Sequence, residues 1–237
     1  TLLLASIPFR LVGAVHAYFL ARARLRDQPM RWYSRWYALA LITLTFPVTA
    51  LVIRTFLFQP FDLPGGSMSP TLNIGDHVWV RKFAYILSQP QRGDVIVFKT
   101  AQGDDFVKRV TGLPGDRIQL VAGRVYVNGN PARLQRIPDL WLDCDEFGSC
   151  TRVPQFFEWL PGGSRHRILQ ASTNGDMDNT AAVTVPPDSY YVLGDNRDNS
   201  NDSRLDLGFV PARNILGRVV VKFIDGRIHR VVWQSVN

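Results

Sequence analysis

The distribution of apolar residues divides the chain into two parts. Residues 37–58 form a run of 22 mostly apolar positions, which as a helix would extend about 33 Å and so cross a bilayer core. Pro47 is expected to kink such a helix, and Arg54 lies close enough to its end to reach the interface. We therefore predict a membrane-spanning helix over 37–58, with a buried helix of a soluble protein as the alternative.

A second apolar segment precedes this run, at residues 1–20, but it contains Pro8, Arg10 and His16. It could be a first span, part of a span, or a helix lying in the interface. Residues 21–36 between the two segments hold five Arg and one Asp, and the positive-inside rule keeps such a loop in the cytoplasm. A cleavable signal peptide is the competing explanation, but the 37–58 run is too long and no small-residue cleavage site follows it. We expect an anchor over 1–58 and an extracytoplasmic domain over 59–237.

From residue 59 onwards, short apolar runs alternate with glycine and proline, which is typical of β-structure. Strands are predicted over 77–83, 94–99 and 190–193. Hairpins are predicted around Ala122-Gly123 and around Asp225-Gly226, the second being a strong signal for a two-residue turn. The fold class is thus mainly β, with antiparallel sheets that are partly barrel-like, behind an N-terminal transmembrane helical anchor. Residues 130–187 are rich in Pro, Gly and Asp, and we expect an irregular insertion there.

The net charge of +7 raises the question of a nucleic-acid partner. Residues 1–58 carry a net charge of +6, however, and residues 59–237 only +1. A nucleic-acid-binding domain would carry a basic stripe on its folded part. The charge therefore indicates a membrane-flanking segment and not a nucleic-acid partner.

The two cysteines, Cys144 and Cys150, are separated by five residues. In an oxidising compartment such a pair most simply forms a disulfide. Two cysteines without a nearby histidine supply too few ligands for zinc. The sequence also lacks a Walker loop and a Gly-x-Gly-x-x-Gly turn, so neither a metal nor a cofactor is predicted.

Candidate chemistry is concentrated in two short stretches. Ser67 lies in a turn rich in glycine and proline, and Lys108 lies among apolar residues. A serine hydroxyl is a weak nucleophile until a base takes its proton, and a lysine can be that base if burial lowers its pKa. On an alternating strand, Phe106 and Lys108 would share one face. The alternative is a surface lysine on a strand.

Four blocks in this order make the sequence similar to the bacterial type I signal peptidase (leader peptidase) family. They are Pro-Gly-Gly-Ser-Met-Ser-Pro-Thr-Leu at 64–72 with Gly-Asp at 75–76, Arg-Gly-Asp-Val-Ile-Val-Phe at 92–98, Lys-Arg-Val-Thr-Gly-Leu-Pro-Gly-Asp at 108–116, and Gly-Asp-Asn-Arg-Asp-Asn-Ser-Asn-Asp-Ser-Arg at 194–204. With the second apolar run they cover most of 37–220. The cysteine pair is similar to one in Gram-negative members.

The resemblance implies roles for individual residues. Ser67 would be the nucleophile and Lys108 the general base, and the Ser200 hydroxyl would hydrogen-bond the lysine nitrogen. An Asp202–Arg204 ion pair would support the site. Shallow substrate pockets would be lined by Leu63, Met68, Leu72, Phe106 and Val107. Core packing is the alternative role for these five, most of all for Leu72 and Val107.

The function implied is a membrane-bound serine endopeptidase of the bacterial inner membrane, with its catalytic domain on the periplasmic (extracytoplasmic) side. Its partners would be secretory preproteins and the lipid bilayer, and it would cut signal peptides after small residues in an Ala-x-Ala-like pattern through an acyl-enzyme. Ser67 follows the predicted span by nine residues, at most about 30 Å of extended chain.

One position departs from the pattern of enteric members, which carry a serine two residues before the nucleophile. This chain has Gly65 there, as many Gram-positive members do. A side-chain donor to the oxyanion, worth about 3 kcal/mol in other serine hydrolases, is thereby excluded at position 65.

Two other functions remain open from the sequence. One is another Ser–Lys peptidase, such as a pilin-processing enzyme or a self-cleaving repressor, although a repressor would bring a DNA-binding domain. The other is a non-catalytic, membrane-tethered β module that binds partners.

Overall fold

The computed structural model describes residues 43–45, 47–49, 58–86, 88–144, 149–226 and 230–236. The chain divides into two compact units, Thr1–Ile53 and Arg54–Asn237. In the first unit the described residues, 43–45 and 47–49, are helical. Among the residues that can be described, no helix is long and apolar enough to cross a membrane. The rest of the predicted anchor lies outside the described residues, apart from Phe58, which belongs to the first strand and not to a helix.

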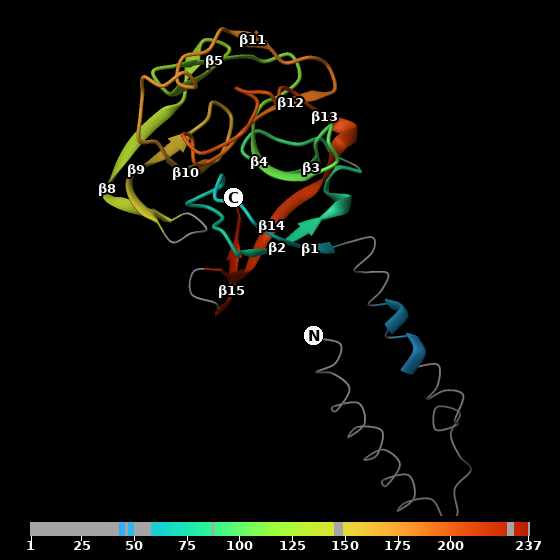
Figure 1. Ribbon diagram of the computed structural model, residues 1–237. Coiled ribbons are helices and arrows are strands. Elements are labelled where there is room, and N and C mark those ends of the chain that lie inside the picture. The colour runs from blue at the N-terminus through green and yellow to red at the C-terminus, as the bar shows by residue number, and fades with distance from the viewer. Residues whose placement is uncertain are drawn as a thin grey trace, which may run out of the picture. The chain divides into compact units, whose positions relative to one another are not determined.

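The described residues of the second unit form β-strands in three antiparallel sheets and two short 3-10 helices (Figure 1). The mainly β prediction is confirmed. The strands of the largest sheet follow the spatial order β1-β2-β14-β3-β4-β12-β13, and β15 also pairs with β14. Their bounds are β1 Phe58–Asp62, β2 His77–Arg81, β3 Val95–Lys99, β4 Asp105–Gly112, β12 Ser189–Leu193, β13 Val210–Pro211, β14 Ile215–Asp225 and β15 Arg230–Ser235. The 3-10 helices are η3, Lys82–Tyr85, and η4, Ala212–Asn214.

Strand β3 explains how this sheet is buried. Its first four residues are buried on both faces, because Val95 and Val97 pack into one hydrophobic cluster while Ile96 and Phe98 pack into another. A strand covered on both sides reads as a continuous apolar run without alternation. The whole of β3 pairs with the first five residues of β4, with Lys108 opposite Ile96. The central position of β4 thus carries the candidate base into the interior.

Two smaller sheets complete the unit. One has the order β11-β5-β6-β7 and the other β10-β9-β8. Their bounds are β5 Arg117–Val121, β6 Arg124–Val127, β7 Asn130–Pro131, β8 Arg133–Cys144, β9 Cys150–Trp159, β10 Arg165–Leu169 and β11 Val183–Thr184. The predicted hairpin around Ala122-Gly123 is confirmed, with Ile118 opposite Val127.

The expectation of an irregular segment over 130–187 is wrong. Strands β8 and β9 are 12 and 10 residues long and pair along most of their length, and they lie beside β10 on one side of Figure 1. Arg and Pro within these strands weaken the alternation of polar and apolar residues on which strand prediction depends. A register shift between Ile137 and Leu140 interrupts it further.

The hairpin formed by β14 and β15 also differs from its prediction. Asp225 pairs with Arg230, so the strands are not joined by the two-residue Asp-Gly turn that was expected. Gly226 instead packs against the chain at residues 74–76, where a Cβ would lie 2.4 Å from the Ile74 carbonyl oxygen, and its N–H donates to Asp76 Oδ1 at 2.7 Å. This tertiary contact overrides the local turn preference.

Candidate active site

The segment that carries Ser67 is a tight turn held by its own backbone. The Ser69 N–H donates to the Gly66 carbonyl at 3.1 Å, and the Leu72 N–H donates to the Met68 carbonyl at 2.9 Å. The side chains of Met68 and Leu72 are buried in the adjacent hydrophobic cluster. Ser67 lies inside the turn closed by Gly66 and Ser69 and directly precedes the buried Met68, so its backbone is held in position relative to the sheet.

Lys108 approaches this turn from β4. Its Nζ lies 2.7 Å from Ser67 Oγ and donates to the Val107 carbonyl at 3.1 Å. The same nitrogen lies 5.2 Å from the centre of the Phe106 ring, as expected if Phe106 and Lys108 share one face. The structure thus brings together two residues that are 41 positions apart in the sequence.

Burial determines the charge of this amine. Lys108 is only 4% exposed, and desolvation lowers its pKa to about 8. The negative charges of Asp202 and Asp195 act in the opposite direction and limit this decrease. About a tenth of Lys108 is therefore neutral at pH 7 and about half at pH 8, which supplies the neutral amine that a general base requires.

A cleft of about 560 Å³ opens beside the pair. It is bounded by two segments of chain, 61–68 and 105–108, together with Asn199 and Asn201. Four of the five residues predicted to bind substrate line it: Leu63, Met68, Phe106 and Val107. The fifth, Leu72, does not, because its side chain is fully buried in the hydrophobic core.

The fourth sequence block forms the loop after β12, next to Ser67. Ser200 is buried there, but its Oγ has no hydrogen-bond partner among the described residues. The expected hydrogen bond from Ser200 to the lysine is therefore not formed, and the contacts of Lys108 Nζ go to Ser67 and Val107 instead. The orienting role of Ser200 stays a prediction.

The ion pair between Asp202 and Arg204 has the predicted geometry. Arg204 Nε donates to Asp202 Oδ1 and its Nη2 donates to Oδ2, both at 2.8 Å. The Gly194 N–H adds a third hydrogen bond to Oδ2 at 3.0 Å. Burial alone would raise the pKa of Asp202, but the hydrogen bonds and charge of Arg204 lower it below its usual value. This carboxylate therefore remains ionised and fixes the loop.

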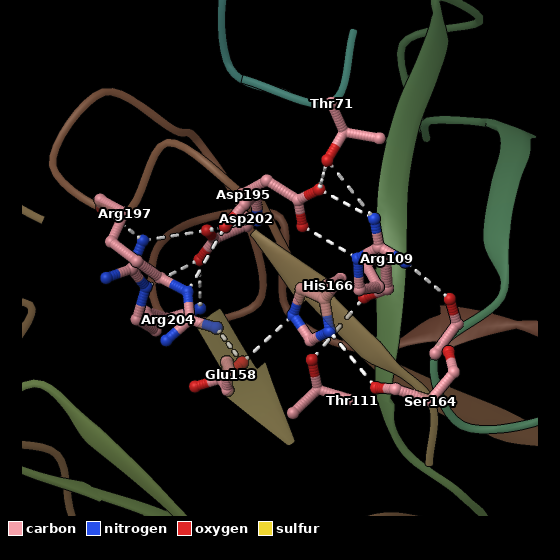
Figure 2. A network of polar contacts seen from close by, with 12 residues as sticks. Thr71, Arg109, Thr111, Glu158, Ser164, His166, Asp195, Arg197, Asp202 and Arg204 are labelled. Carbon is pink, nitrogen blue, oxygen red and sulfur yellow. Dashed lines mark hydrogen bonds and ion pairs between the residues drawn. The ribbon is translucent and has the colours of Figure 1, made fainter. Parts of the chain in front are cut away.

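Further charged side chains surround this loop (Figure 2). Arg109 donates to both oxygens of Asp195, at 2.8 and 2.7 Å, and also to the Gly93 carbonyl at 2.7 Å. Thr71 Oγ1, from the turn that follows the nucleophile, donates to Asp195 Oδ2 at 2.5 Å. These contacts connect Arg109, which follows Lys108 on β4, with Asp195, which follows Gly194 in the loop.

A second cluster lies next to the first. Glu158 of β9 forms an ion pair with Arg197, and its carboxylate also lies 3.0 Å from His166 Nε2. Burial opposes ionisation of Glu158, but the charges and hydrogen bonds of Arg197 and His166 lower its pKa to about 2.

Sequence reasoning missed Glu158, His166, Arg109 and Thr71. Glu158 and His166 lie in the segment interpreted as irregular. Arg109 directly follows Lys108 in the third block, and its position beside the base was the one signal that could have identified it.

The two cysteines lie at the end of the β8–β9 hairpin, where the register pairs Cys144 with Cys150. The neighbouring Asp143 accepts a hydrogen bond from Asn196 Nδ2 at 2.7 Å. The end of the hairpin is thereby connected to the loop that carries Ser200.

In the part of the chain that the structure describes, no group of three or more His, Cys, Asp or Glu side chains is arranged to hold a metal ion. The chemistry available in the cleft is that of a serine hydroxyl beside a buried amine.

Comparison with known proteins agrees with this arrangement. The model of the family described as "Signal peptidase, peptidase S26" matches residues 34–224. The chain is 38% identical to signal peptidase I of Pseudomonas aeruginosa over 199 residues, which cover 73% of this chain and 68% of that protein. It is 36% identical to signal peptidase I of Leptolyngbya laminosa over 185 residues, covering 74% of this chain and 73% of that protein.

A crystal structure of a signal peptidase I from Enterococcus faecalis is 25% identical to the chain and covers 55% of it and 97% of the solved chain. Its TM-score is 0.32.

The extent of these sequence matches defines a serine peptidase of the S26 class. The chain belongs to the type I signal peptidase family, as its four sequence blocks indicated. Membership in this family favours cleavage of signal peptides over the two other functions that the sequence left open, a different Ser–Lys peptidase and a non-catalytic module.

Proposed function

We propose that the enzyme cleaves signal peptides from exported preproteins with Ser67 as the nucleophile and neutral Lys108 as the general base. Lys108 Nζ takes the proton of Ser67 Oγ while Oγ attacks the scissile carbonyl carbon. The resulting ammonium gives this proton to the leaving amine nitrogen as the C–N bond breaks, and an acyl ester remains on Ser67. Lys108 then deprotonates a water molecule that attacks the ester, and the proton returns to Ser67 Oγ when the acid is released.

The observation that carries this proposal is the 2.7 Å contact between Lys108 Nζ and Ser67 Oγ at a lysine that is 4% exposed. A neutral amine has two N–H groups and one lone pair. Since the Val107 carbonyl accepts one N–H, the nitrogen is oriented and its lone pair is available to the serine hydroxyl. Contact and neutrality together are what a general base requires.

The negative charge that develops on the attacked carbonyl oxygen needs a donor. Among the described residues, none accepts a hydrogen bond from the Ser67 N–H, so this group is available to donate to the oxyanion. Gly65 offers no side-chain donor. We propose that the Ser67 amide is the main donor in this enzyme.

The lining of the cleft supports the choice of substrate. The apolar side chains of Leu63, Met68, Phe106 and Val107 suit the small side chains that precede a signal-peptide cleavage site. We further propose that residues 37–57 anchor the enzyme in the bacterial inner membrane, with the catalytic domain on the periplasmic side. In that oxidising compartment the opposed Cys144 and Cys150 would form a disulfide.

The test is incubation of the purified chain with a secretory precursor, followed by mass spectrometry of the new amino terminus. The parent chain should cut once, after a small residue. Ser67→Ala and Lys108→Ala should each abolish the cut, and Lys108→Arg should be equally inactive because a guanidinium does not deprotonate. Activity retained in either alanine variant would refute the assignment of the pair.

A further inference from the structure

The loop that carries Ser200 is attached to two different parts of the molecule. On one side, the Asn196 N–H donates to the carbonyl of Ser67 at 3.0 Å. On the other, the Leu169 N–H donates to the Asp195 carbonyl at 2.8 Å, and the Arg197 N–H donates to the Leu169 carbonyl at 2.9 Å. Leu169 is the last residue of β10. A single stretch of three residues therefore connects the three-stranded sheet to the nucleophile.

This connection is reinforced by a buried triad of side chains, Glu158, His166 and Arg197. Glu158 and His166 lie directly opposite each other on β9 and β10, and they are 0% and 4% exposed. Arg197 reaches Glu158 from the loop and is 2% exposed. Figure 2 shows Glu158 lying between Arg197 on one side and His166 on the other.

Arg197 also determines the shape of the loop around it. Its Nε donates to the Gly194 carbonyl at 3.3 Å, and its own carbonyl accepts from Arg204 Nη2 at 2.6 Å. Arg204 in turn pairs with Asp202, which holds the Gly194 N–H. The contacts therefore form a closed ring that runs from the Gly194 carbonyl through Arg197, Arg204 and Asp202 back to the Gly194 N–H. Gly194 itself packs against Ser200.

Stability alone does not account for such a triad. The cost of removing charges from water commonly exceeds their attraction, and well-packed apolar residues in place of a buried ion pair are often neutral or stabilising. Glu158, Arg197, Asp195, Arg109 and Asp202 are all at most 2% exposed, and each is in this loop or contacts one of its residues. Hydrogen-bonded ion pairs hold side chains in one orientation, which apolar packing does not. This matters in a catalytic centre, where a displacement of about 1 Å lowers activity.

We propose that Glu158 is a positioning residue for catalysis. Through Arg197 it holds the 194–204 loop, and with it the carbonyl of Ser67, in the place where Ser67 Oγ meets Lys108 Nζ. The three-stranded sheet thus acts as a support for the catalytic pair and is not a passive insertion. This inference rests on the proposed roles of Ser67 and Lys108.

The test separates positioning from stability with two variants. Glu158→Gln leaves Arg197 buried without its counter-charge, so both the melting temperature and kcat should fall. In the double variant Glu158→Gln/Arg197→Met both members of the Glu158–Arg197 ion pair are replaced by neutral side chains, and the melting temperature should return to near the parental value. If Glu158 positions the loop, kcat of the double variant stays about 10- to 100-fold below the parent, while KM for the precursor changes less than about threefold.

A matched control is Asp116→Asn, which breaks the largely buried ion pair between Arg92 and Asp116, neither of which lines the cleft. It should lower the melting temperature and leave kcat unchanged, when each protein is assayed well below its own melting temperature.

Three results would overturn the inference: parental kcat in Glu158→Gln, recovery of kcat together with stability in the double variant, or a loss confined to KM. Ser67→Ala, measured alongside, distinguishes this failure from failure of the proposed function. If Ser67→Ala is inactive while the double variant is as fast as the parent, only the role of Glu158 is refuted. If Ser67→Ala cleaves, the catalytic assignment itself is wrong.

Discussion

Gly194 packs directly against Ser200, and no side chain fits between them. A Cβ at position 194 would lie 2.2 Å from Ser200 Oγ, and it would also lie 2.6 Å from the carbonyl oxygen of Ser67. The loop after β12 and the nucleophile turn can therefore approach each other only because residue 194 has no Cβ. The glycine is required here by close approach, since its φ is not in the left-handed region.

Gly194→Ala should consequently separate the two segments. We expect kcat to fall by about 100-fold or more, since a displacement of about 1 Å at the reacting atoms has an effect of this size. Steady-state cleavage of a precursor measures the effect. Gly175→Ala is the control, because a Cβ there would lie 3.3 Å from Asp178 Oδ2, which needs only a small shift of a residue that does not line the cleft, and kcat should be unaffected. Parental kcat in Gly194→Ala would show that the close approach is irrelevant to catalysis.

The lowered pKa of Lys108 determines how activity depends on pH. Below a pKa of about 8 most of the amine is protonated and cannot accept the serine proton. The value of kcat/KM should therefore rise about tenfold per pH unit below this pKa and level off above it, because kcat/KM reports ionisations of the free enzyme. A cleavage assay from pH 5 to 10 in buffers of constant ionic strength tests this. A flat profile would be incompatible with a lysine base.

The same burial should make Lys108 costly to the folded state. Its pKa is lowered from 10.5 to about 8 on folding, so the folded protein binds this proton more weakly than the unfolded chain does. Below about pH 8 the buried Lys108 ammonium destabilises the folded state by the full amount. As pH rises from there to 10.5 this destabilisation disappears. Lys108→Met should thus be more stable than the parent at pH 7, by up to about 3 kcal/mol, and this advantage should shrink at high pH.

Denaturant unfolding of both proteins at pH 7 and pH 10 measures this difference. The variant should be inactive at either pH. A variant that is less stable than the parent at pH 7 would contradict the direction of the pKa change.

The residues that could be predicted are those whose signal is local in the sequence. Ser67 and Lys108 lie in short, recognisable blocks, and the hairpin of β5 and β6 follows from alternating apolar residues and one turn. Glu158 could not be predicted, because its role depends on lying opposite His166 and next to Arg197 of a distant loop.

The burial of Leu72 and the missing hydrogen bond of Ser200 illustrate a second limit. A sequence block identifies which residues gather at the site, but it does not determine which side chains face the cleft. The prediction of a two-residue turn at 225–226 was wrong for a related reason. The packing of Gly226 on residues 74–76 outweighs the local preference of Asp-Gly for such a turn.

A substitution at Gly65 should change how well the oxyanion is stabilised. A Cβ at this position would meet no atom within 4 Å, and its φ is not in the left-handed region, so a serine fits without strain. Since residue 65 lines the cleft beside Ser67, the new hydroxyl can add a donor to that of the Ser67 amide. We expect Gly65→Ser to raise kcat up to about tenfold, less than the 100-fold or greater effect of a main oxyanion donor elsewhere. Gly65→Ala supplies the same Cβ without the hydroxyl, so an increase confined to the serine variant identifies the donor. Equal kcat in both variants would mean that the backbone donors already suffice.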